Sequence, residues 1–240
     1  MKHWPAIAVA LILAAGGLGC GDDKETTGPE GPPTDGLLAF YSFDANADDQ
    51  SGNGNDGTLL GGASIQSGYL YTRANDTDVL SLPNTLLDGL TDFTVAAWVR
   101  IALLQVGANQ FLSGANAGED NAIGLWYSNA ADRWNLCLDG TTHNYGGALT
   151  EDGNWHHVAV IRDGTVSTLY FDGNMVETSI VVSGDPLSVD PGGLVIGQDQ
   201  DTVGGSFDAG ESWGGYVENL RFYDRALSAA EVDRLVAETD

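Results

Sequence analysis

The chain has 240 residues, with 34 acidic against 9 basic side chains and a formal net charge of −25. A surface of this sign repels phosphate backbones and anionic bilayers, which argues against a nucleic-acid partner and favours a divalent cation, since calcium prefers carboxylate oxygens. The 33 glycines, with apolar residues that lean toward Val, Leu and aromatic types, indicate an all-β domain.

The first 19 residues have the pattern of a secretory signal peptide. Lys2 and His3 precede an apolar run over Ala6–Leu13, which is too short to span a bilayer as a helix. Leu18-Gly19-Cys20 resembles a bacterial lipobox, although Gly17 stands where leucine is usual. The resemblance implies diacylation of Cys20 and a lipid anchor in the bacterial envelope, reached by secretion across the inner membrane. The alternative is an ordinary signal peptide in which Cys20 is incidental.

Residues 20–36 are expected to form a disordered tether between Cys20 and a domain over residues 37–240. The stretch from Gly21 to Gly36 contains three prolines and no aliphatic residue, which is typical of a solvated linker. After Cys20, only Cys137 remains, within an alternating run. We therefore interpret Cys137 as a buried packing residue and not as a catalytic thiol.

Short alternating segments follow one another from Leu37 onward and are separated by glycine and asparagine turns. Such spacing predicts a two-sheet antiparallel jelly-roll sandwich, with a hairpin turn at Asp172-Gly173. Near the C-terminus, Ser228 and Glu231 predict a capping box that begins a short helix with an apolar stripe. The predicted strands cover Leu38–Phe43, Val79–Leu82, Phe93–Ile101, Gly124–Tyr127, Trp134–Leu138, Trp155–Arg162, Thr165–Phe171, Leu194–Gly197 and Tyr216–Tyr223, and the helical stripe comprises Val232, Leu235 and Val236.

Four separated motifs carry a resemblance to a known family. The segments that start at Asp49, Phe93, Asn154 and Arg221 read DQSGNGNDG, FTVAAWV, NWHHVA and RFYDRALS. They resemble the LamG-type jelly roll of the concanavalin A-like lectin and glucanase superfamily. Because that fold hosts lectins, adhesion modules and glycosidases alike, the resemblance implies the fold more strongly than the function.

The acidic segment from Ile196 to Ser212 resembles the calcium loop of pentraxins, including the paired glycines at 204 and 205 and an aromatic anchor at Phe207. The resemblance implies that two calcium ions are bridged by Asp199 and Asp201. It also implies that Gln200 offers its main-chain carbonyl and that Asp208 and Glu211 complete the second ion.

A second segment fits the same resemblance, because Asp120 and Asn121 match an Asp-Asn pair that pentraxins bring to the same site from the start of a strand. Without metal, the five carboxylates of this site would repel one another, so we expect the loop to be ordered only when calcium is bound. These carboxylates belong to Asp120, Asp199, Asp201, Asp208 and Glu211. Trp126 matches an apolar wall residue of the pentraxin ligand hollow, although a role in the core is an equal alternative. Ala96 and Ala159 stand at the approximate positions of the pentraxin disulfide.

These features predict calcium-dependent binding of a carbohydrate or phosphorylated glycan, and not catalysis. One alternative is a structural or adhesion module in which calcium only stabilises the fold. Another is a glycoside hydrolase with unrecognised residues, although no Glu-x-Asp-x-x-Glu run is present. Ring-like oligomers are known in pentraxins, but the matched motifs do not encode their contacts.

Two further segments are interpreted without a metal. The loop from Asp44 to Asp56 lacks the glycine and glutamate that an EF-hand requires, so a structured turn is expected there. His156 and His157 should face opposite sides of a strand, and with no third ligand at suitable spacing a zinc site is not expected.

Overall fold

The fold is described by a computed structural model that covers residues 30–75, 77–103, 108–146, 152–176 and 180–238 and leaves out the side chains of residues 119–121, 180 and 181. Residues 31–240 form one compact unit. The predicted signal peptide, Cys20 and the first part of the predicted tether lie outside the described residues. Within these ranges, no helix is both long and apolar enough to cross a membrane.

One sheet contains nine described strands: β1 (Leu37–Tyr41), β3 (Ser64–Gln66), β4 (Tyr69–Thr72), β6 (Phe93–Leu103), β11 (His156–Asp163), β12 (Val166–Phe171), β13 (Asn174–Met175), β14 (Ile180–Val181) and β16 (Gly214–Tyr223). Their order is β13-β12-β11-β6-β16-β4-β3, with β1 beside β16 and β14 beside β12. The pairings are antiparallel, and a bulge interrupts β16 between Glu218 and Arg221.

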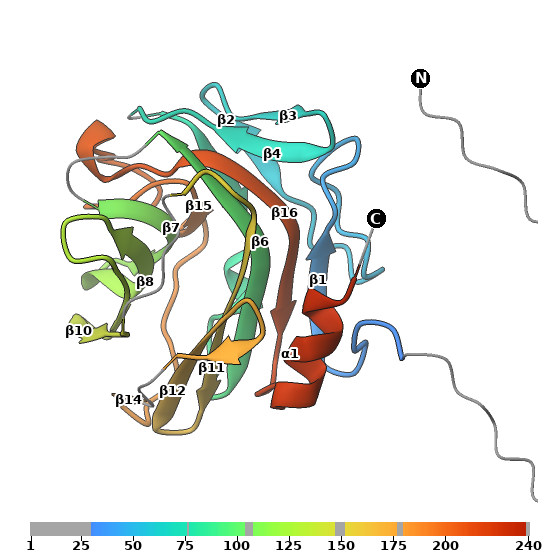
Figure 1. The fold of residues 1–240 in the computed structure, drawn as a ribbon. Helices are drawn as coiled ribbons and strands as arrows, with labels where there is room; N and C mark the ends of the chain where they lie inside the picture. The colour runs from blue at the N-terminus through green and yellow to red at the C-terminus, as the bar shows by residue number, and fades with distance from the viewer. Residues whose placement is uncertain (1–29, 76, 104–107, 147–151, 177–179, 239–240) are drawn as a thin grey trace, which may run out of the picture. The chain divides into compact units, whose positions relative to one another are not determined.

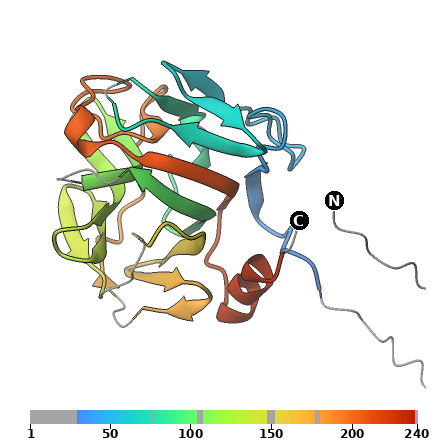
Figure 2. The same cartoon turned by 45° about the horizontal axis from the view of Figure 1, so that its top comes forward.

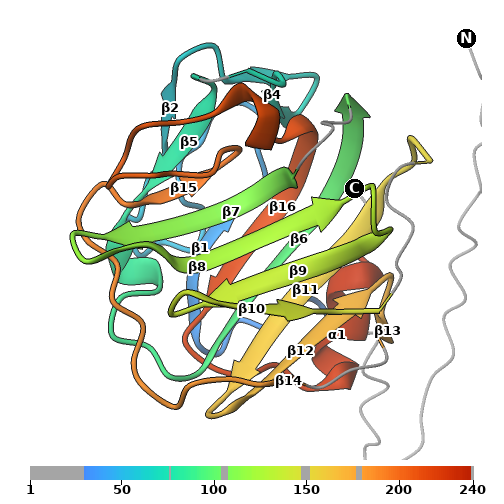
Figure 3. The ribbon, with the colours of Figure 1, turned by 90° about the vertical axis from the view of Figure 1, so that its left-hand side faces the viewer.

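The other sheet contains seven described strands: β2 (Thr58–Leu60), β5 (Val79–Leu82), β7 (Ala108–Asn116), β8 (Glu119–Ser128), β9 (Arg133–Leu138), β10 (Thr141–Asn144) and β15 (Leu194–Ile196). Their order is β10-β9-β8-β7-β15-β5-β2, again with antiparallel pairs. Figure 3 looks onto the outer face of this sheet, with strands of the nine-stranded sheet behind it. The predicted all-β two-sheet sandwich is thus confirmed.

The core lies between the two sheets and follows from the alternation of apolar side chains. In β6, Val95, Ala97 and Val99 point into this core, while the residues between them point outward. Three fully buried aromatic rings pack together at one end: the centroid of Trp213 lies 5.7 Å from that of Phe111 and 6.1 Å from that of Trp134. Each predicted strand segment is found, while β7 and most of the shortest strands were not predicted.

The C-terminal helix α1 (Ala229–Val236) covers part of the outer face of the nine-stranded sheet and lies beside β1 in Figures 1 and 2. The predicted capping box is present, and Val232 and Leu235 are fully buried. Beneath the helix, Ala96 of β6 and Ala159 of β11 are direct cross-strand partners. The two positions matched to a pentraxin disulfide are therefore neighbours, and alanine side chains leave room there for α1.

The end of the predicted tether packs on the sandwich. Pro33 is buried, and its carbonyl accepts a hydrogen bond of 3.0 Å from the hydroxyl of Tyr223. The carbonyl of Gly36 accepts a further bond of 2.9 Å from the amide of Asp224. Ordered contacts with the fold therefore begin at least four residues before β1, inside the range that the composition assigned to the tether.

Candidate functional site

The acidic loop connects β15 to β16 and is held in place by the buried side chain of Gln200. Its Nε2 donates hydrogen bonds to the carbonyl of Gly193 (2.8 Å) and to the Oγ of Ser113 (3.1 Å), and its Oε1 accepts one from the amide of Gly204 (2.7 Å). Gln200 is 0% exposed, so these bonds form away from competing water. Because the side chain is used internally, Gln200 can offer a metal only its main-chain carbonyl.

The loop reverses at the predicted glycine pair. The amide of Gly205 donates to the carbonyl of Thr202 (2.9 Å), and Gly204 has a φ of 67°. A Cβ at Gly204 would lie 2.9 Å from the carbonyl oxygen of Gly192, so both backbone conformation and space require glycine there. Phe207, which we expected to anchor the loop, is only half-buried and belongs to neither core cluster. The anchoring role falls to Gln200 and to the residues that end the loop.

The end of the loop is fixed by a short helical turn and by a buried tryptophan. The carboxylate of Asp208 accepts a hydrogen bond of 2.7 Å from the amide of Gly210 and thereby caps the 3₁₀ turn η2 (Ala209–Glu211). Trp213 follows in the core, where burial of roughly 200 Å² of apolar surface contributes about 5 kcal/mol. Ser212 forms a β-bridge with Gln110 of β7. Glu211 is therefore held beside the outer face of the seven-stranded sheet.

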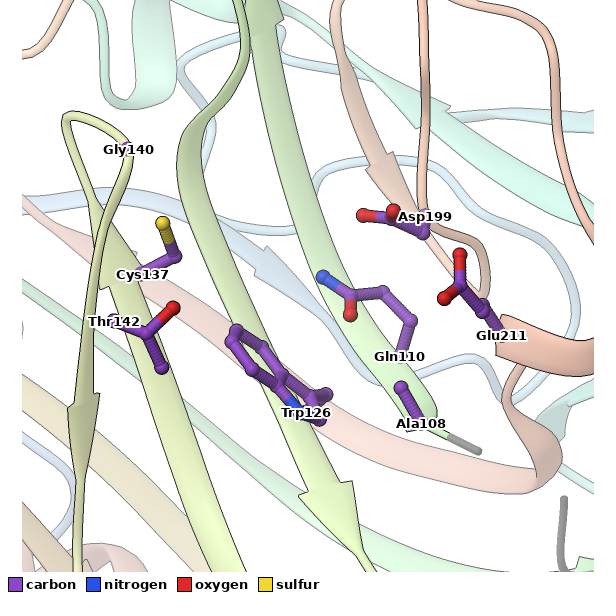
Figure 4. Close-up of a pocket in the computed structure, with 8 residues that line it drawn as sticks. All are labelled: Ala108, Gln110, Trp126, Cys137, Gly140, Thr142, Asp199 and Glu211. Carbon is purple, nitrogen blue, oxygen red and sulfur yellow. The ribbon is translucent and has the colours of Figure 1, made fainter. Parts of the chain in front are cut away.

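A hollow of about 380 Å³ lies between the loop and this outer face. Figure 4 shows the carboxylates of Asp199 and Glu211 on one side of the hollow and the ring of Trp126 across from them, with Gln110 between. Acidic oxygens thus stand opposite an aromatic surface. The complete lining comprises Ala108, Gln110, Trp126, Cys137, Gly140, Thr142, Asp199 and Glu211.

The donor set at this wall fits a hard divalent cation. None of the lining side chains is cationic, and among the described residues the carboxylate of Glu211 has no hydrogen bond and no ion pair. Asp201 and Asp208 are exposed in the same loop and add further carboxylate oxygens. Calcium is bound in proteins by such oxygens together with main-chain carbonyls. Among the described side chains, no three or more His, Cys, Asp or Glu residues lie close enough together to hold a metal ion. The side chain of Asp120 is not among those described.

Asp120 and Asn121 are the second and third residues of β8, and their side chains lie outside the described part of the structure. The backbone places them near the hollow, because the amide of Asp139 donates to the carbonyl of Ala122 (3.0 Å) and Gly140, which follows, lines the hollow. The two separated segments implied by the resemblance therefore approach the same hollow.

Two lining positions have a role that differs from simple packing in the core. Trp126, for which a core role was an equal alternative, is half-buried on the outer face of β8 and lines the hollow. Cys137 is buried, as expected, but it also faces the hollow and not the core between the sheets. Gln110 and Thr142 were not singled out in the sequence, because only the pairing of β7, β8, β9 and β10 brings them to this face.

The remaining candidates have structural roles. His156 lies between Asp172 (2.8 Å) and Asp152 (3.1 Å); burial opposes its charged form, but the two carboxylates outweigh this and raise the pKa of His156. His157 faces the other way, and burial, reinforced by the charge of Arg221, lowers the pKa of His157 to about 4. In the loop from Asp44 to Asp56, Asp49 accepts hydrogen bonds from surrounding amides, as a structured turn requires.

The sequence and fold match proteins of one superfamily. Residues 74–233 match the family model described as the concanavalin A-like lectin/glucanases superfamily. The chain belongs to this superfamily. It is also 31% identical over 180 residues to human Pentraxin-4, and 31% identical over 178 residues to human Neuronal pentraxin-2. These matches cover 69% and 70% of this chain but only 35% and 37% of the relatives, so the chain spans about a third of their length.

Solved structures share the fold at lower sequence identity. A heptameric SAP-like pentraxin from Limulus polyphemus superposes with a TM-score of 0.54 at 22% identity, covering 69% of this chain and 84% of that one. A sialidase from Trypanosoma rangeli superposes with a TM-score of 0.66 at 19% identity, covering 91% of this chain and 35% of that one. The chain is thus a concanavalin A-like sandwich with homology to pentraxins.

Proposed function

We propose that this protein binds carbohydrate or phosphorylated glycan ligands in a calcium-dependent manner at the bacterial cell envelope. The observation that carries the proposal is the hollow in which Asp199 and Glu211 stand opposite Trp126. Carboxylates on one wall and an aromatic ring on the other suit a ligand with both metal-binding oxygens and an apolar face. The homology to pentraxins supports the same conclusion.

The residues proposed to hold two calcium ions are those named from the sequence. Asp199 and Asp201 would bridge the ions, with the carbonyl of Gln200, the side chains of Asp208 and Glu211, and Asp120 with Asn121 completing the set. When bound, calcium supplies coordination positions for phosphate, carboxylate or paired hydroxyl oxygens of a ligand. The chain's own contribution is to fix the loop through Gln200 and Trp213 and to offer Trp126 as an apolar surface.

Calorimetric titration of calcium into the full chain tests the metal site. We expect saturable binding of about two ions that is lost in an Asp199→Asn/Asp201→Asn variant, since both residues are proposed to bridge the ions. A matched Asp163→Asn/Asp233→Asn variant removes the same charge from exposed positions on β11 and α1 and should bind calcium as the parent does. Equal binding by all three proteins would refute the proposed site.

A glycan array probed with and without a chelator tests the ligand. Saccharides and phosphate-bearing glycans should be retained only with calcium present, and Trp126→Ala should weaken their binding by roughly tenfold, as expected for the loss of an aromatic contact, while leaving calcium binding intact. If calcium binds but no calcium-dependent ligand is retained, calcium has a stabilising role only and the proposed recognition function is wrong.

Membrane attachment through Cys20 is proposed from the lipobox resemblance alone. Metabolic labelling with a fatty-acid analogue should label the parent chain, and a Cys20→Ser variant should lose the label and leave the membrane fraction. Label that persists in this variant would contradict the anchor without affecting the proposed ligand site.

A further inference from the structure

A second surface, on the opposite side of the sandwich, carries a cluster of aromatic rings around one arginine. We call Tyr69, Tyr71, Trp155, Tyr216 and Arg100 the aromatic platform. Tyr69 and Tyr71 come from β4, Tyr216 from β16 and Arg100 from β6, and Trp155 immediately precedes β11. The rings lie close together, with centroids 4.9 Å apart for Tyr69 and Trp155 and 4.9 Å apart for Tyr71 and Tyr216.

The alternation of the strands places this platform on the outer face of the nine-stranded sheet. Arg100 has the same parity in β6 as Ala96, which packs under α1, whereas Val99 points into the core. Helix α1 covers the end of this face away from β4, as Figure 1 shows. Among the described residues, no helix or strand covers the platform end, where the rings are half-buried.

Arg100 differs from most other arginines of the described chain. Arg73, Arg221, Arg225 and Arg234 are paired with carboxylates. Arg100 instead lies over the rings of Trp155 and Tyr216, with its Cζ 5.0 Å and 4.4 Å from their centroids. It has no hydrogen bond or ion pair within the described ranges. A planar group with unused N–H donors is therefore held among aromatic rings at the surface.

We propose that the aromatic platform is a second, calcium-independent binding site for a neutral glycan. Aromatic rings pack against the C–H faces of pyranose rings, and Arg100 can donate hydrogen bonds to their hydroxyl oxygens. Arg100 is the one cation of the platform, and Glu218 points outward two residues beyond Tyr216. The chain as a whole carries a net charge of −25. The resulting negative potential repels an acidic polymer, so the charge favours a neutral ligand.

The size of the platform also favours a glycan over a second protein. If each of the four rings exposes about a quarter of roughly 200 Å², the platform offers on the order of 200 Å². A stable protein interface needs about 800 Å² from each partner. One or two sugar rings match the smaller area, and repulsion between two copies of so acidic a chain disfavours self-association.

Calorimetry and tryptophan fluorescence in the presence of EDTA test this site. The probes are neutral hexasaccharides of β-1,4-glucose, β-1,4-xylose, β-1,3-glucose and α-1,4-glucose. We expect at least one to bind the full chain, with roughly tenfold weaker binding for Trp155→Ala and for Tyr71→Ala. The conservative variants Trp155→Phe and Tyr71→Phe keep a ring and should retain most of the affinity. Met175→Ala removes an exposed apolar side chain elsewhere on the same sheet and should bind as the parent does.

Three binding results and one sedimentation result would overturn the proposal. The binding results are the absence of binding to every neutral hexasaccharide, binding that disappears with EDTA, and preferential binding of oligogalacturonate. A change in sedimentation behaviour caused by Trp155→Ala would likewise assign the platform to a protein interface. The Asp199→Asn/Asp201→Asn variant separates the two sites, since it should abolish calcium-dependent binding at the hollow and leave the platform unaffected.

Discussion

Replacement of Gln200 by alanine should destabilise the fold and weaken calcium binding together, although Gln200 is not proposed to offer its side chain to the metal. The substitution removes the hydrogen bonds to Gly193, Ser113 and Gly204. At about 1 kcal/mol for each bond, the loss amounts to roughly 3 kcal/mol. For a domain of about 200 residues, that corresponds to a fall in Tm of roughly 6–12 °C.

The assay is urea unfolding of parent and variant, each with calcium and with EDTA. The difference in EDTA reports the loss of the internal contacts of the Gln200 side chain, because no metal contributes to it. The calcium-induced gain in stability should also be smaller in the variant, since a freed Gly204 turn no longer fixes the backbone between Asp199 and Asp208. Gln50→Ala serves as the control, because Gln50 is exposed and, within the described ranges, its side chain bonds only to Ser42.

Unfolding of Gln200→Ala at the same urea concentration as Gln50→Ala would refute the predicted contribution of these hydrogen bonds to stability. A loss of stability without any loss of calcium affinity would refute a narrower point, namely that Gln200 positions the loop for the metal. One titration series thus separates the effect of Gln200 on stability from its effect on calcium affinity.

Two further predictions concern the nine-stranded sheet. His157 has a pKa of about 4 in the folded chain, so the unfolded chain binds the extra proton first as the pH falls. The free energy of unfolding should therefore decrease by about 3 kcal/mol between pH 6.5 and pH 4. In urea unfolding at several pH values, His157→Phe should lose this part of the acid sensitivity, and an unchanged pH profile would contradict the prediction. An Ala96→Cys/Ala159→Cys variant should form a disulfide, because the two residues are direct cross-strand partners. Closing a loop of about 60 residues should stabilise the fold by up to about 4 kcal/mol, reduced by any strain from sulfur atoms beneath α1. Thermal unfolding with and without reductant measures the gain, and free thiols in the oxidised protein would show that the pair is misplaced.

The sequence predicted the elements whose signal is local. Alternation in segments such as Phe93–Ile101 identified strands because each apolar residue reports its own burial. The capping box at Ser228 and Glu231 identified α1 because both partners lie within one turn. Strand β7 gives a weaker signal, since it contains Asn109, Gln110 and Ser113, which are nevertheless buried.

The composition of the candidate site could be predicted only in part, because pairing between distant strands creates it. The order of acids in the loop indicated Asp199 and Glu211, but Gln110 and Thr142 join the hollow through the register of β7 to β10. The aromatic platform was missed for the same reason. Tyr71, Arg100 and Trp155 are far apart in sequence, and each taken alone is an ordinary outward-facing residue in or beside a strand.

The acidic loop combines two parts that respond differently to charge. Mutual repulsion of the carboxylates predicts a loop that is ordered only with calcium, while its backbone contacts come from groups that carry no charge: the side-chain amide of Gln200, the turn at Gly204 and the ring of Trp213. None of these contacts uses a carboxylate, whereas Asp201, Asp208 and Glu211 project toward solvent or the hollow. Repulsion therefore acts mainly on side chains that can move apart at small cost in water. To the extent that these uncharged contacts position the backbone, more of the calcium-binding free energy can appear as affinity and less is needed to fold the loop.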